Sequence, residues 1–97
     1  MIVSAKQGPH GVLLVITDTN ILGKTFEEGK LQLDLSKQFY QGDEMGKEEV
    51  ILLLRSARDI QFTGKESVAL GIEKDLVNPE HILYVQGVPH AEVVIGS

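Results

Sequence analysis

This chain places strand-forming segments at both ends and helix-forming segments between them. Residues 2–7 and 12–17 are rich in β-branched and apolar side chains, and the turn-forming residues 8–11 separate them, which predicts a hairpin. Residues 82–86 and 91–95 repeat the pattern around residues 87–90. Hairpins that enclose a helical middle predict an α+β fold, a mostly antiparallel or mixed sheet with two helices on one face.

The middle of the chain contains two helix patterns. Residues 47–58 have acidic side chains in the first turn and basic ones in the last, the order that complements the helix dipole. Their apolar positions cover about half of the circumference, wider than the ~100° stripe that packs on one sheet face, so a second burial partner is expected. Residues 63–66 have the capping-box sequence Thr-Gly-Lys-Glu, which predicts that Thr63 caps a helix over residues 64–75.

Shorter elements are expected between these blocks. Residues 24–27 and 31–35 flank a Glu-Gly-Lys turn and predict a second hairpin. Residues 36–40 predict one helical turn, residues 41–46 a loop, and residues 60–62 a short strand. The strand order of the sheet does not follow from these patterns.

Length and composition exclude several classes of protein. With 97 residues the chain is expected to form a single domain over residues 1–97. Cysteine is absent, which excludes disulfides, thiolate metal sites and cysteine nucleophiles. The net charge of −5 disfavours non-specific binding to nucleic acid. The longest apolar run, residues 50–54, is far shorter than the roughly 20 residues of a membrane span, and no secretion signal is visible, so a cytoplasmic location is expected.

The segment from Gly87 to Glu92 contains the most site-like pair of side chains. His90 and Glu92 are two residues apart at the start of an apolar strand, and strand alternation puts both on one face. A carboxylate beside an imidazole raises its pKa and fixes its tautomer, so this pair is a candidate for general base catalysis.

The rest of a catalytic set is not defined by the sequence. Ser4, Ser36, Ser67 or a substrate hydroxyl could each supply a nucleophile, and nothing in the spacing selects one. The three histidines each follow a proline by one or two residues, in loops or at strand entries, so they would converge on a metal only through an unusual tertiary arrangement. We predict neither a metal nor a cofactor.

Several segments together resemble a known family. They are Ile21-Leu22-Gly23-Lys24 with Phe26 and Glu28-Gly29, then Leu33, Phe39-Tyr40, and Gly87-Val88-Pro89-His90-Ala91. Nearly the whole chain is similar to the small archaeal proteins of the domain of unknown function family number four-two-four. The resemblance implies an archaeal, cytoplasmic housekeeping protein with no assigned activity. From its segments we take Lys24, Tyr40, Pro89 and His90 as candidate binding residues.

Three functional hypotheses remain open. The wide apolar helix and the incomplete catalytic set favour a non-enzymatic protein-binding or interaction domain, whose partner is another protein or a second copy of the chain. The first alternative is a small enzyme or metal-binding protein centred on His90 and Glu92. The second is an accessory protein associated with RNA or translation. The sequence favours a protein that is not an enzyme but does not decide this.

Overall fold

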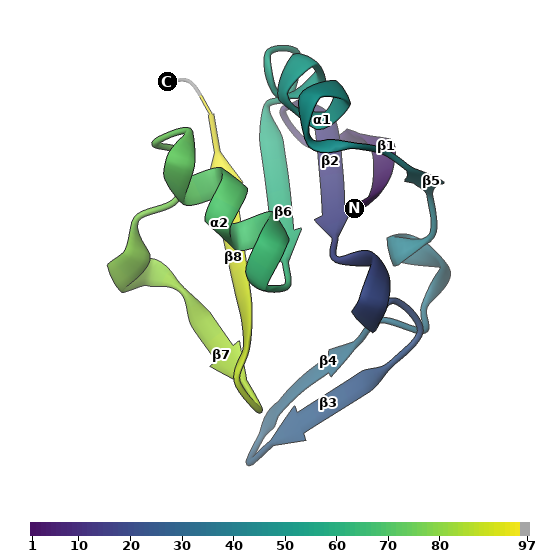
Figure 1. The fold of residues 1–97 in the computed structure, drawn as a ribbon, viewed down its shortest axis with the longest axis vertical. Helices are drawn as coiled ribbons and strands as arrows, with labels where there is room; N and C mark the ends of the chain where they lie inside the picture. Colours follow the sequence, from purple (N-terminus) through teal and green to yellow (C-terminus); the bar gives the residue numbers. More distant parts are fainter. Residues whose placement is uncertain (96–97) are drawn as a thin grey trace.

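The computed structural model describes residues 1–95 and is built on two sheets (Figure 1). Six strands form one sheet in the order β5-β1-β2-β6-β8-β7, and β3 and β4 form a separate two-stranded sheet. The strands are β1 (Ile2–Gly8), β2 (Gly11–Thr17), β3 (Thr25–Glu28), β4 (Leu31–Asp34), β5 (Asp43–Glu44), β6 (Asp59–Thr63), β7 (Leu83–Val85) and β8 (Val88–Val94). The helices are α1 (Lys47–Leu54) and α2 (Lys65–Glu73), and the 3₁₀ turns are η1 (Thr19–Ile21), η2 (Gln38–Tyr40) and η3 (Pro79–His81).

The three predicted hairpins are present, and each has a short turn. In the β1–β2 hairpin Gly8 pairs with Gly11, so the turn consists of two residues rather than four. In the β7–β8 hairpin the turn residues Gln86 and Gly87 have φ angles of 50° and 77°. Positive φ at both central positions is the type I′ geometry, whose twist matches that of the flanking strands.

The centre of the large sheet is a long-range parallel pair. β2 runs parallel to β6, with Thr17 opposite Thr63, while β6 pairs antiparallel with β8. The sheet is therefore mixed, as predicted. Because β2 and β6 are parallel neighbours, their carboxyl ends meet at the same edge of the sheet.

Both helices cover the same face of this sheet, which we call the helix face (Figure 1). Its buried core joins residues from the strands with residues from α1 and α2: Met1, Val3, Leu14, Ile16, Val50, Leu54, Ala57, Ile60, Phe62, Val68, Leu70, Val77 and Ala91. The predicted arrangement of an α+β fold with two helices on one face is confirmed.

The opposite face, which we call the hairpin face, has a much smaller apolar cluster. The buried members are Leu33, Leu35 and Val85, and the partly buried members are Ile21, Phe26, Tyr40 and Val88. Phe26 and Leu33 come from the β3–β4 hairpin and Tyr40 from η2, so this face is covered by short segments rather than by a helix.

The first helix is shorter than predicted. α1 ends at Leu54, and the backbone N–H of Arg58 donates instead to the carbonyl of Val12 at 2.8 Å, which ties the chain to the sheet. Ile51 and Leu53 pack against the core from its sides, so most of the wide apolar stripe is used within the fold. Leu52, 63% exposed, is the exception on this helix.

Residues 41–46 contain a short strand that the sequence did not indicate. β5 pairs with β1 at the sheet edge, and the N-terminal amino group of Met1 forms a 3.0 Å ion pair with Glu44. Over residues 1–95, none of the helices has the length and apolar character needed to cross a membrane.

Candidate binding pocket

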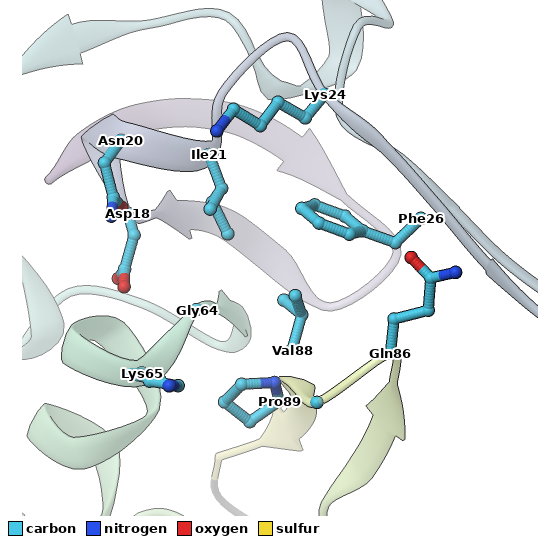
Figure 2. A pocket seen from close by; sticks show the side chains of 11 residues that line it. Asp18, Asn20, Ile21, Lys24, Phe26, Gly64, Lys65, Gln86, Val88 and Pro89 are labelled. Carbon is cyan, nitrogen blue, oxygen red and sulfur yellow. The ribbon is translucent and has the colours of Figure 1, made fainter.

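A pocket of about 340 Å³ opens where the carboxyl ends of β2 and β6 meet the β3–β4 hairpin and the β7–β8 turn (Figure 2). Three separate parts of the chain line it. The lining residues are Asp18, Asn20, Ile21, Lys24, Phe26, Gly64, Lys65, Gln86, Gly87, Val88 and Pro89.

One lining residue, Asp18, caps α2 from a distant part of the sequence. Its carboxylate accepts hydrogen bonds from the backbone N–H of Glu66 (2.9 Å) and Ser67 (2.7 Å) and from the Ser67 hydroxyl (2.6 Å). Asp18 is 6% exposed. These bonds satisfy donors at the start of the helix that have no partner within it, and the helix dipole stabilises the negative charge there.

The predicted cap by Thr63 is wrong. Thr63 is the last residue of β6, and the N-cap position belongs to Gly64, which has φ of 108°. This conformation favours glycine, and a Cβ at Gly64 would also collide with the Asp18 carboxyl group. The glycine therefore allows the chain to turn directly from β6 into α2 while Asp18 approaches the helix N-terminus.

The walls of the pocket combine two cations with an apolar surface. Lys24 and Lys65 are exposed, and within residues 1–95 neither ammonium group has an ion-pair or hydrogen-bond partner. Figure 2 shows the Phe26 ring directed into the pocket, with Val88 and Pro89 facing it from below.

Two further features define the chemistry of this site. The backbone N–H of Gln86 donates to the Glu28 carboxylate at 2.7 Å and fixes the β7–β8 turn against the β3–β4 hairpin. The charges of Lys24 and Lys65 exceed that of the hydrogen-bonded Asp18, so the lining carries a net charge of about +1, whereas the whole chain carries −5. The pocket is suited to a ligand that joins an anionic group to an apolar body.

The structure brings together some of the residues selected from the sequence and separates others. Lys24 and Pro89 both line the pocket, so the Leu-Gly-Lys-x-Phe and Gly-Val-Pro-His-Ala segments meet there. Tyr40 and His90 do not line it. Sequence reasoning missed Asp18, which directly follows the strand over residues 12–17.

His90 and Glu92 lie on the hairpin face, as strand alternation predicted. The Nε2 atom of His90 is 3.4 Å from the Glu92 carboxylate, and its Nδ1 atom is 2.8 Å from the Thr63 hydroxyl. The His90 side chain is 12% exposed and that of Glu92 is 68% exposed. Tyr40 belongs to the apolar cluster on the same face, where burial, and then the charges of Glu92 and Asp34, raise the pKa of its phenol.

The candidate nucleophiles do not reach this pair. The hydroxyl of Ser36 donates to Asp34, and that of Ser67 donates to Asp18. Ser4 is in the same cross-strand row as Glu92 but three strands away, about 14 Å at the usual strand spacing. His90 and Glu92 therefore form a pair without a serine partner among residues 1–95.

The histidines lie apart from one another. His10 is 3.1 Å from the carboxylate of Asp59, at the start of β6, whereas His90 contacts Thr63 at its end. His81 is in η3. Over the described part of the chain, no group of three or more metal-ligating side chains is close enough to hold an ion.

Together, these features define an α+β protein with a small, locally cationic pocket. The family described as "Protein of unknown function (DUF424)" matches residues 5–95, and the chain belongs to this family. A crystal structure of an uncharacterized conserved protein from Methanopyrus kandleri has the same fold, with a TM-score of 0.80 and 20% identity over 99% of this chain and 93% of that chain. None of the curated proteins matches the sequence.

Proposed function

We propose that this protein is a non-enzymatic protein-interaction domain and that the pocket at the carboxyl ends of β2 and β6 is its binding site. One observation carries the proposal: Lys24 and Lys65, without partners among residues 1–95, line the same pocket as an apolar surface that contains Phe26. Anionic groups of the partner pair with the lysines, and an adjoining apolar group packs on this surface.

The composition of the lining supports binding rather than catalysis. The Asp18 carboxylate accepts three hydrogen bonds at the start of α2, which gives it a structural role in capping the helix. The remaining polar side chains are amides and lysines, which serve recognition without a base to activate them. An archaeal, cytoplasmic housekeeping setting is part of the same proposal and rests on the family resemblance.

NMR titration with simple probes tests the location of the site. We expect benzoate and phenyl phosphate to shift the amide resonances of the pocket, around Lys24, Lys65 and Gly87, and cyclohexanol to shift them less because it lacks the charge. In a Lys24→Gln/Lys65→Gln variant the shifts should fall severalfold.

Matched controls use lysines outside the pocket. Lys30, in the β3–β4 turn, and Lys37, before η2, are both exposed, so Lys30→Gln and Lys37→Gln should leave the titration unchanged. Shifts confined to other surfaces, or equal losses in the control variants, would overturn the assignment of the site.

The alternative of a small enzyme has one observation in its favour. The Thr63 hydroxyl orients the His90 ring and leaves Nε2 directed toward Glu92 and solvent, as a proton-transfer group requires. If this alternative holds, His90→Gln abolishes turnover of a hydrolytic substrate panel without lowering the binding of pocket probes. Wild-type protein without turnover in the panel would leave this alternative unsupported.

A further inference from the structure

A second hollow adjoins the pocket on the helix face, between α2 and β7. It has a volume of about 230 Å³ and shares Lys65, Gly87 and Pro89 with the first pocket. Its other lining residues are Val68, Ala69, Ile72, Ile82 and Tyr84. One hollow thus has mixed polar and apolar walls, and the other is almost wholly apolar.

The shared residues lie where the two hollows adjoin. Gly87 has no side chain, is exposed, and has open space where a Cβ would stand, so no side chain separates the hollows at this position. Pro89 is buried and lines both hollows. An elongated ligand can therefore cross from one hollow into the other.

The apolar hollow leaves large side chains in contact with water. Ile72 is 37% exposed and Tyr84 is 53% exposed, and both line it. Tyr84 belongs to β7, an end strand of the six-stranded sheet. Exposed apolar side chains next to a concave surface mark binding sites more often than isolated ones do.

The dimensions and charge favour a peptide segment as the occupant. Small-molecule sites usually enclose about 300–1,000 Å³, and each hollow here is at or below the low end of that range. Two lysines are far fewer than the roughly 6–10 phosphate contacts of a nucleic-acid site. A peptide joins an anionic side chain to an apolar one a few residues away, which matches the arrangement of the two hollows.

We infer that the two hollows form one groove, which binds a short acidic segment of a partner protein. Acidic groups of the segment pair with Lys24 at one end of the pocket and with Lys65 at the other (Figure 2), and a large apolar side chain packs against Ile72 and Tyr84. This inference rests on the proposed function, because it names the partner of the same pocket.

Selection from a displayed library of random short peptides tests the inference. Wild-type protein should enrich sequences in which Asp or Glu stands within a few positions of Leu, Ile or Phe. Enriched peptides, synthesised and measured by fluorescence anisotropy, should bind Lys24→Glu and Lys65→Glu variants about tenfold or more weakly, equivalent to ~1.4 kcal/mol. Ile72→Glu should weaken binding by a similar factor through the apolar hollow.

Two control variants and a fold check make the result specific. Lys30→Glu and Lys37→Glu change the net charge by the same amount outside the groove and should alter affinity less than twofold. Circular dichroism should be identical for all variants, since each substituted side chain is exposed.

The possible failures are distinguishable. Enrichment of basic peptides, or equal weakening by the control variants, overturns the acidic-segment inference. If no peptide is enriched while benzoate and phenyl phosphate still shift the pocket resonances, this inference fails and the proposed site remains. If those probes also give no shift, both fail. A dimer in sedimentation that dissociates in the Lys65→Glu variant would replace the partner segment with a second copy of the chain.

Discussion

The two faces of the six-stranded sheet are covered in different ways. The helix face packs against α1 and α2 through a continuous core that includes Phe62, Leu14 and Val50. The hairpin face has a cluster of three buried apolar residues and carries polar side chains, among them Thr63 and His90. Because apolar burial is the main favourable term in folding, the helix face should hold most of the stability.

The pocket lies between these two coverings. The β3–β4 hairpin closes one side and the start of α2 the other, and neither reaches across the carboxyl ends of β2 and β6. The carboxyl ends of these strands therefore leave a hollow between the helices and the hairpin, and neither apolar core is interrupted by it. The difference between the faces therefore explains where the chain can hold a ligand.

The largest effect that tests this comparison is expected at Phe62. Its side chain is 0% exposed in the helix-face core, and Phe62→Ala should lower the free energy of unfolding by about 3–5 kcal/mol. Leu35 is also 0% exposed but belongs to the smaller cluster. Leu35→Ala should lower the free energy of unfolding by about 2 kcal/mol, because the short hairpin can relax around the smaller side chain. Urea denaturation measures both. Equal losses would show that the hairpin face contributes as much as the helix face.

The second effect concerns the connection between the pocket and α2. Asp18→Ala removes the acceptor of three hydrogen bonds and leaves the buried Ser67 hydroxyl without its partner, so we expect a loss of about 2–3 kcal/mol. Asp18→Asn keeps one acceptor oxygen and should lose less. Amide hydrogen exchange should report faster opening of α2 in particular. Unchanged exchange in α2 with a normal melting curve would contradict the capping role.

The sequence predicted the local elements well, for a physical reason. The three hairpins depend on alternation and on turn residues within a few positions of each other. Such features lie within a short window of sequence.

Contacts between distant parts of the chain could not be predicted from local sequence patterns in the same way. The cap of α2 comes from Asp18, 48 residues before Glu66, and competed with a local Thr63 pattern that matched by coincidence. The parallel pairing of β2 with β6 likewise joins distant segments. The two family segments were identified, but only the fold brings Lys24 and Pro89 to the same pocket, so the pocket could not be located from the sequence.

A pair of conservative substitutions sharpens the comparison on the hairpin face. Thr63→Val removes the 2.8 Å hydrogen bond to His90 and should cost about 1 kcal/mol. Thr17, its 0% exposed neighbour across the sheet, has a hydroxyl oxygen without a hydrogen-bond partner among residues 1–95. Thr17→Val should therefore raise stability by about 1 kcal/mol, because an unsatisfied buried polar atom is removed. Thermal melts of both variants should shift in opposite directions. A loss of stability in Thr17→Val would show that its hydroxyl has a partner in solution.

The smallest effect concerns the stability at low pH that Asp34 contributes at the end of β4. The Ser36 hydroxyl, then the Ser36 N–H and the Thr25 hydroxyl, donate to Asp34 and hold the pKa of its carboxyl below the ordinary 3.8.

The folded-state pKa of Asp34 is lowered, so its stabilisation is present above pH 3.8 and is lost as the pH falls through the folded value. The same sign applies to Glu44, whose pKa is lowered from 4.5 mainly by the Thr19 hydroxyl and the N-terminal amino group. Carboxyl-detected NMR titration should show the Asp34 pKa moving up toward 3.8 in Ser36→Ala while Glu44 stays constant. Because Asp34 is only partly buried, solvent screens its interactions, and the melting temperature at neutral pH should hardly change. An Asp34 pKa that does not move in this variant would assign its shift to the remaining donors, and a parallel change at Glu44 would show that the effect spreads through the fold instead of acting locally.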